Sequence, residues 1–212
     1  MKLLKITLVS IVVILFIAFA TGYILYIKNN TEVLTLDDAA RKNVSGSFVQ
    51  LTDGITHYEL AGSDTGKVVV LVHGFSVPYY IWDSTFVKLV HEGYRVLRYD
   101  EFGRGFSDRP EKVYEAAFLR KQLEELLIKL NLSSVHAIAG LSFGGPVVTD
   151  FVVHHPTQVE KVILVDPFYP VESTETGGTQ FPESFMRFMM ALSPEVEMEE
   201  MVEISPSIIL LN

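Results

Sequence analysis

Residues 140–145 read GLSFGG, and they stand between a predicted strand and a predicted helix. A G-x-S-x-G pattern alone is common, but between a strand and a helix it indicates a tight turn that projects the serine hydroxyl. Gly140 and Gly144 are small because neighbouring backbone crowds such a turn. The N–H groups at the start of the following helix favour an oxyanion beside Ser142. We therefore interpret Ser142 as a nucleophile; the competing interpretation is a glycine-rich turn with an idle serine.

The chain after residue 46 alternates between strand and helix patterns. Val68–Val72 is an unbroken apolar run, which is typical of a strand buried on both faces. Asp53 and Gly54 join two shorter strand patterns and are a strong hairpin signal. Val113–Leu130 has leucines at helical spacing, which predicts an amphipathic helix. The predicted strands are 47–51, 55–60, 68–72, 94–99, 135–139 and 162–165, and the predicted helices are 81–91, 113–130 and 143–155. This order predicts an α/β fold, a mostly parallel sheet with helices on both faces.

The composition excludes several classes of function. The 212 residues are 49% hydrophobic, so the chain can bury a core. A net charge of −9 argues against electrostatic binding of nucleic acid. The sequence has no cysteine, which excludes disulfides and a cysteine nucleophile. His, Asp and Glu residues show no metal-ligand spacing, and nothing implies an organic cofactor, so we expect neither a metal nor a cofactor.

The N-terminus differs from the rest of the chain. Residues 6–27 contain no charged residue, and at ~1.5 Å per residue they span about 33 Å, enough to cross a hydrocarbon core of roughly 30 Å. Lys2 and Lys5 precede this run and Lys28 ends it. These features predict one N-terminal transmembrane helix that remains as an anchor.

A cleaved signal peptide is the alternative for this segment. Residues 18–20 read AFA and resemble a signal-peptidase site, so cleavage near Ala20 would release a secreted protein. The apolar run continues to Ile27, which is too long for a typical signal peptide. Basic residues on the two sides of the run are nearly balanced. The very short N-terminal tail favours a soluble domain outside the cytoplasm.

Four motifs follow four predicted strands in order, and together they resemble the α/β-hydrolase superfamily. They are HGF at 73–75, DEFGRGFSDRP at 100–110, GLSFGG at 140–145 and VDP at 165–167. The resemblance covers residues 46–212 and implies a parallel sheet that carries a serine nucleophile.

The resemblance also implies roles for particular residues. The backbone N–H groups of Phe75 and Phe143 match the oxyanion-hole positions, and residues from 168 onward match the start of a cap over the site. Members of the superfamily that open epoxides or displace halides have Asp at the position of Ser142. Ser142 therefore favours acyl chemistry through a serine ester. We call the turn between strand and helix that holds Ser142 the nucleophile elbow.

The family's catalytic order of serine, acid and histidine is not completed in this sequence. All six histidines precede residue 156. His154 and His155 follow Ser142 by about 18 Å of helix, so we expect them to close that helix rather than to act as the base. His73 reads as a structural residue before the oxyanion loop. His57 and His91 are expected at the surface. His136 is expected in the core or at an edge of the sheet, with its hydrogen bonds satisfied.

The sequence also leaves more than one interpretation for the catalytic acid. Asp166 follows the strand after the elbow, where a minority of the superfamily carries its acid, and it is the candidate within this sequence. The competing role for Asp166 is to orient its loop. Asp100 and Asp108 are expected to form hydrogen bonds within their loop. We expect the base and two further strands to come from residues beyond Asn212, so that these 212 residues alone are inactive and leave an exposed parallel edge.

We expect four regions: a membrane anchor at 1–28, a linker at 29–45, an incomplete α/β-hydrolase core at 46–170 and the start of a cap at 171–212. The Met- and Phe-rich segment 181–204 is predicted to be helical, either as cap packing or as an adaptable wall for an acyl chain.

The expected function is a membrane-anchored serine hydrolase for carboxylic esters, including lipid-like esters. One alternative is a membrane-tethered binding protein or a decayed hydrolase without activity. Another is a C–C bond hydrolase or an acyltransferase on the same fold.

Overall fold

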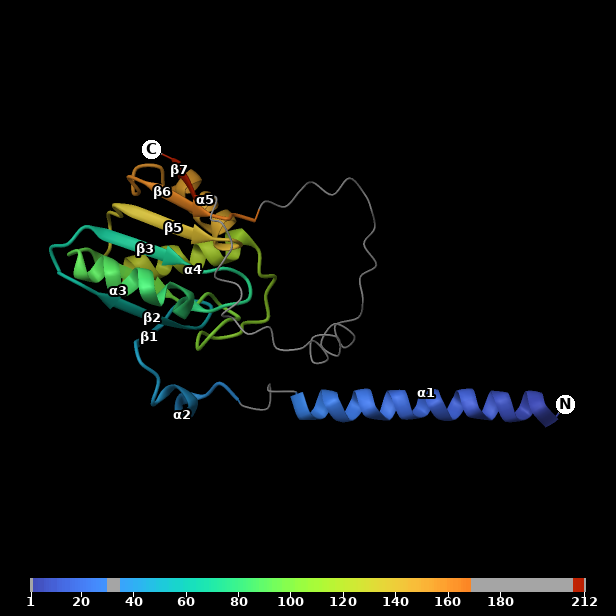
Figure 1. Cartoon of the computed structure of the whole chain (residues 1–212). Helices are drawn as coiled ribbons and strands as arrows, with labels where there is room; N and C mark the ends of the chain where they lie inside the picture. Colours follow the sequence, from blue (N-terminus) through green and yellow to red (C-terminus); the bar gives the residue numbers. More distant parts are fainter. Residues whose placement is uncertain (1, 30–34, 169–207, 212) are drawn as a thin grey trace. The chain divides into compact units, whose positions relative to one another are not determined.

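The computed structural model describes residues 2–29, 35–168 and 208–211. The chain divides into two compact units, and the described residues of the first include helix α1 (Lys2–Asn29). The second unit begins at Leu36 and holds the sheet and the other helices (Figure 1). The predicted helix at 181–204 lies outside the described residues.

Helix α1 is long and apolar enough to cross a membrane over Lys5–Lys28, although a signal sequence would meet the same criterion. Its apolar side chains are exposed, as Phe16 and Phe19 show at 69% and 72%. A helix that is apolar all round, and whose side chains are exposed among the described residues, is suited to lipid rather than to water.

A seven-stranded sheet organises the second unit. Its order is β1-β2-β4-β3-β5-β6-β7, and the four strands β4, β3, β5 and β6 are mutually parallel. Strands β1, β2 and β7 are antiparallel to their neighbours. The strands are β1 (Ser47–Gln50), β2 (Ile55–Ala61), β3 (Val68–Val72), β4 (Arg95–Tyr99), β5 (Ala137–Leu141), β6 (Val162–Val165) and β7 (Ile208–Leu211). The predicted α/β fold with a mostly parallel sheet is therefore confirmed.

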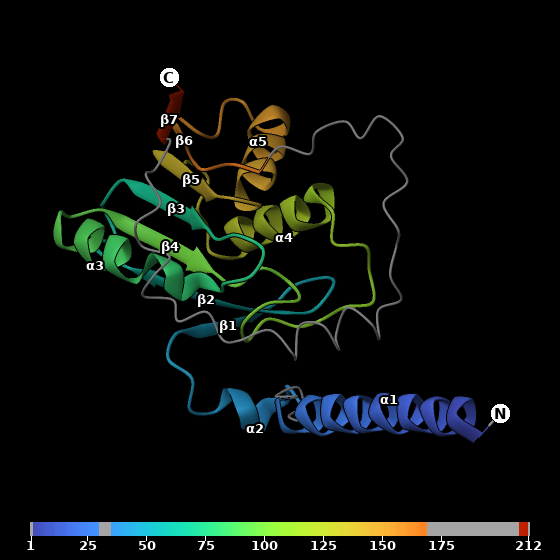
Figure 2. The same ribbon diagram turned by 45° about the vertical axis from the view of Figure 1, so that its right-hand side comes forward.

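Helices cover both faces of this sheet, as Figure 2 shows. Alternate residues of β3 divide between the two cores: Val70 and Val72 belong to the larger core with α4 and α5, whereas Val69 and Leu71 belong to the core with α3. This division explains why β3 is apolar throughout. The helices are α2 (Asp38–Arg41), the 3-10 helix η1 (Tyr79–Trp82), α3 (Asp83–His91), α4 (Ala116–Lys129) and α5 (Gly144–His154).

Three elements differ from the sequence prediction by two residues or more at one end or both, and most others by one residue. Helix α4 begins at Ala116 rather than at Val113, because Glu115 is extended and serves as the N-cap. Strand β5 is shifted by two residues and ends at Leu141, since Gly140 and Leu141 still pair with β6. The predicted helix at 81–91 starts as the 3-10 turn η1 before it becomes α3.

Two further expectations are wrong. The parallel edge of β6 is not open, because β7 pairs antiparallel with it from Val162↔Leu211 to Val165↔Ile208. The apolar run near the end of the chain therefore supplies a strand. His57 is not at the surface: it is 2% exposed, stacked between the rings of Phe48 and Tyr79.

We expect Leu123→Ala to lower the free energy of unfolding by about 2–5 kcal/mol, because Leu123 is fully buried in α4 and its loss leaves a cavity. Guanidinium titration followed by the fluorescence of Trp82, the only tryptophan, measures the change. Ile128→Ala on the same helix is the control, since Ile128 is 74% exposed and should change stability by less than about 0.5 kcal/mol. Equal effects of the two variants would contradict the packing of α4.

Candidate active site

Ser142 occupies a strained turn between β5 and α5. Its φ of 50° lies in the left-handed region, which costs a residue with a Cβ atom about 1 kcal/mol or more. Three backbone hydrogen bonds hold it there: its N–H donates to Val165 O at 2.9 Å, and its carbonyl accepts from Gly145 at 3.0 Å and Phe168 at 2.9 Å. The strain is thus maintained by the elements on both sides of the turn.

Neighbouring backbone crowds this turn, as the sequence predicts. A Cβ atom on Gly140 would lie 2.5 Å from the carbonyl oxygen of Gly144, and one on Gly144 would lie 2.5 Å from that of His73. A Cβ atom on Gly74 would lie 3.7 Å from Ser142 Oγ. The HGF loop after β3 therefore lies directly against the serine hydroxyl.

Phe75 and Phe143 each adjoin a residue of this site, since Phe75 follows Gly74 and Phe143 follows Ser142. Among the described residues, neither of their backbone N–H groups has an acceptor for its hydrogen bond. Phe143 is the N-cap of α5, so its N–H stands at the positive end of the helix. Their role as an oxyanion hole stays a prediction, but both donors are available for it.

His73 fixes the direction of the Phe75 N–H group. The two His73 ring nitrogens bind different partners: Nδ1 contacts the Gly74 carbonyl at 2.7 Å and Nε2 accepts from the N–H of Glu101 at 2.9 Å. The proton therefore sits on Nδ1. Gly74 C=O and Phe75 N–H belong to one trans peptide and point in opposite directions, so binding the carbonyl aims the N–H. Burial lowers the pKa of His73 to about 4, which keeps the ring neutral.

None of the six histidines, all of which are described, hydrogen-bonds to Ser142. Each histidine contacts other partners: His57 contacts Asp100, His73 contacts Gly74 and Glu101, His91 contacts Glu92, His136 contacts Glu160, His154 contacts the Asp150 carbonyl and His155 contacts Glu124. His154 and His155 do end helix α5, as expected. His136 lies one residue before β5 and is held by Glu160.

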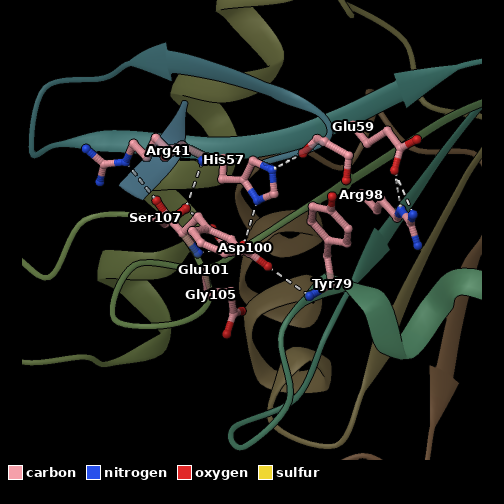
Figure 3. Close-up of polar contacts among 12 residues, drawn as sticks. Arg41, His57, Glu59, Tyr79, Arg98, Asp100, Glu101, Gly105 and Ser107 are labelled. Atoms are coloured by element: carbon pink, nitrogen blue, oxygen red, sulfur yellow. Dashed lines mark hydrogen bonds and ion pairs between the residues drawn. The ribbon is translucent and has the colours of Figure 1, made fainter. Parts of the chain in front are cut away.

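A buried histidine–aspartate pair lies in a separate polar cluster (Figure 3). His57 Nδ1 is 2.8 Å from Asp100 Oδ2, and Nε2 is 2.7 Å from the carbonyl of Ser45. Asp100 also accepts from the N–H groups of Tyr79 and Phe106. Both ring nitrogens face acceptors, so His57 ties the segment before β1 to the loop after β4. A cavity of about 340 Å³ beside this pair is lined by residues that do not include Ser142.

Asp100 and Asp108 act as loop hydrogen-bonders, as expected. Asp108 accepts from the N–H of Ile55 at 2.7 Å and pairs with Arg41. Asp166 follows β6 with a φ of 42°, next to the Val165 carbonyl that binds Ser142. Its catalytic role stays a prediction. The described residues contain no group of His, Asp and Glu that would hold a metal ion.

Glu101 is a feature that sequence reasoning missed. Its side chain is fully buried, and neither carboxyl oxygen has a hydrogen-bond partner among the described residues. Burial raises the pKa of Glu101 to about 8. Its carboxyl lies 4.0 Å from His73 Nδ1, but the two groups are not an ion pair at neutral pH, because both are uncharged. The sequence offered one signal, a second carboxylate in succession after a buried strand, since Asp100 and Glu101 follow β4.

Comparisons with known proteins agree with this geometry. The profile of the family described as alpha/beta hydrolase fold matches residues 67–197. The AB hydrolase superfamily protein YfhM of Bacillus subtilis (strain 168) is 34% identical over 158 residues, which cover 70% of this chain and 54% of that protein. The chain thus spans about half the length of this relative.

Two solved structures are similar as well. The esterase EaEST of Exiguobacterium antarcticum has a TM-score of 0.55 and 30% identity over 59% of this chain and 47% of its own. The meta-cleavage product hydrolase CumD of Pseudomonas fluorescens IP01 has a TM-score of 0.50 and 29% identity, covering 55% of this chain and 43% of its own. A parallel sheet with a strained serine between strand and helix defines a hydrolase-type α/β protein. This chain belongs to the α/β-hydrolase fold family.

We expect Glu101→Gln to change how stability depends on pH. A carboxyl whose pKa rises on folding holds its proton more tightly in the folded state, so wild-type stability falls as pH rises from about 4.3 toward the folded value. That folded pKa is about 8. Stability is lost throughout this window, and the glutamine variant lacks this loss because its amide does not titrate. Denaturant titrations at pH 5, 7 and 9 measure the difference.

The matched control for this measurement is Glu92→Gln, since the Glu92 side chain is 60% exposed. Its stability should follow the wild type at every pH. If the curve of Glu101→Gln ran parallel to the wild type from pH 5 to pH 9, the buried carboxyl would not be protonated as described.

Proposed function

We propose that the protein is a membrane-anchored serine hydrolase that acts on carboxylic esters. The observation that carries this proposal is the left-handed Ser142 at the β5–α5 turn, against which the HGF loop lies. The backbone N–H groups of Phe75 and Phe143 lack acceptors among the described residues, which leaves them free for an oxyanion. The similarity to an esterase of known structure supports the same reaction.

In the proposed reaction Ser142 Oγ attacks the ester carbonyl while a general base takes its proton. The N–H groups of Phe75 and Phe143 hold the negative oxygen of the tetrahedral intermediate. The intermediate collapses, the alcohol leaves with the proton from the base, and water then hydrolyses the acyl-enzyme by the same route. The histidines of this chain are committed elsewhere, so we propose that the base comes from residues beyond Asn212, with Asp166 or a later acid to orient it. Residues 1–212 alone would then be inactive.

The proposed substrates are hydrophobic esters, including lipid-derived ones. A transmembrane helix would hold the site near the bilayer, where such esters concentrate. The Met- and Phe-rich sequence at 181–204 would suit acyl chains, because methionine adapts to varied shapes.

C–C bond hydrolysis is a second candidate, favoured by the similarity to a meta-cleavage product hydrolase. Both reactions use a serine at the elbow, so the sequence of the turn does not separate them. Product analysis with a phenyl ester and with a meta-cleavage product distinguishes them, because only hydrolysis of the second substrate yields products of carbon–carbon cleavage.

A fluorophosphonate probe tests the nucleophile. We expect the complete natural protein to be labelled and Ser142→Ala to lose labelling entirely, because the probe reacts only with an activated serine. Ser133→Ala is the control, since Ser133 is an exposed loop residue and its variant should be labelled as the wild type is. A folded wild-type protein that resists the probe would favour a binding protein or a decayed hydrolase.

Alkaline carbonate extraction of membranes tests the anchor. The complete protein should stay in the membrane pellet, because the proposed anchor at Lys5–Lys28 is long and apolar enough to cross the bilayer. A variant that lacks residues 1–28 should be released to the supernatant. N-terminal sequencing supplies the counter-test: a mature protein that begins near Thr21 would show a cleaved signal peptide instead of an anchor.

A further inference from the structure

Arg104 reaches from the loop after β4 to the HGF loop after β3. Its Nε donates to the carbonyl oxygen of Phe75 at 2.9 Å. Its guanidinium also lies over the Phe75 ring, 4.6 Å from the centroid, and 5.7 Å from the ring centroid of Tyr114. One side chain therefore holds both the backbone and the side chain of Phe75.

The hydrogen bonds at Phe75 fix two successive peptide planes. His73 binds the carbonyl of the Gly74–Phe75 peptide, and Arg104 binds the carbonyl of the peptide that follows. The two soft dihedrals of Phe75 set the angle between these planes. With both carbonyls held, the Phe75 N–H has one direction. Its ring is 64% exposed and so receives little support from the core.

The loop that carries Arg104 is itself firmly held. Gly103 and Gly105 flank it with φ values of 82° and 50°, and a Cβ atom on Gly105 would lie 2.0 Å from the carboxylate of Asp100. Ser107 Oγ donates to the Asp100 carbonyl at 2.6 Å, and the Arg104 N–H donates to the Glu101 carbonyl at 3.0 Å. The backbone of Arg104 therefore lies in a hydrogen-bonded turn, which limits the positions that its side chain can take.

We propose that Arg104 is a positioning residue for the oxyanion hole, which holds the Phe75 peptide so that its N–H meets the oxyanion formed on Ser142. This inference rests on the proposed function of Ser142. Arg104 acts through Phe75 and does not contact the substrate.

The kinetic test compares variants of the complete natural protein. Arg104→Met keeps an apolar stem of similar length and removes the donor and the charge. We expect kcat for a small phenyl ester to fall about tenfold, less than the ~10²–10³ lost with an oxyanion donor itself. KM should change little, because the contact matters in the transition state. Arg104→Lys should recover part of the rate, since it keeps a donor and loses the planar stacking.

Arg109→Met is the matched control. Arg109 lies in the same loop and is exposed. Among the described residues its side chain donates only long hydrogen bonds, to the carbonyls of Ser107 and Gly105 at 3.4 and 3.3 Å. Its kcat and fluorophosphonate labelling rate should equal those of the wild type. An equal fall in both arginine variants would mean a general effect of loop charge and would overturn the proposal.

Backbone ¹⁵N order parameters give a readout that does not depend on activity. Those of residues 73–77 should be lower in Arg104→Met than in the wild type or in Arg109→Met, and thermal unfolding checks that each variant is folded. Should Arg104→Met not fold, Arg104→Lys serves for the same comparison. Unchanged order parameters overturn the proposal, as do lower ones with an unchanged kcat. If the wild type is not labelled at Ser142, the proposed function fails separately, and the order parameters still decide whether Arg104 orders the loop.

Discussion

The left-handed turn at Ser142 is the constraint on which the arrangement around it depends. It forces the ends of β3, β5 and β6 together, since the Ser142 N–H donates to the end of β6 and Gly144 packs on the backbone after β3. Only glycine fits at 140 and 144, because a Cβ atom would overlap carbonyl oxygens there. A strained serine persists because parallel strands on both sides hold it. The same close approach brings the HGF loop to the hydroxyl.

The loop after β4 is the second structural support of the candidate site. It combines the His57–Asp100 pair, the Ser107 hydroxyl and Arg104, most of them buried and hydrogen-bonded. Buried polar groups are costly unless they are satisfied, and when satisfied they specify one arrangement. Glu101 is the exception, with a carboxyl that has no partner among the described residues. This loop joins three regions of the chain: the segment before β1, the hairpin β1–β2 and the HGF loop.

Sequence periodicity predicted most of the fold. The strands at 68–72 and 162–165 have the predicted bounds, and the other strands and helices differ by a few residues at their ends. The errors have local causes. Helix α4 begins later than predicted because Glu115 is its N-cap. Strand β5 continues to the elbow because Gly140 and Leu141 still pair with β6. Periodicity reports which face of an element is apolar and does not report where hydrogen bonding stops.

The sequence by itself determined the order of strands and helices, the glycine requirement at the elbow and the family, because these depend on neighbours close along the chain. The tertiary structure decided which polar residues are buried and which loops touch. His57 meets Asp100 across 43 residues and Arg104 meets Phe75 across 29, and such contacts leave no periodic pattern. The pairing of β7 with β6 is of the same kind. Contacts of this range are set by the path of the backbone through the sheet, and only the folded chain shows them.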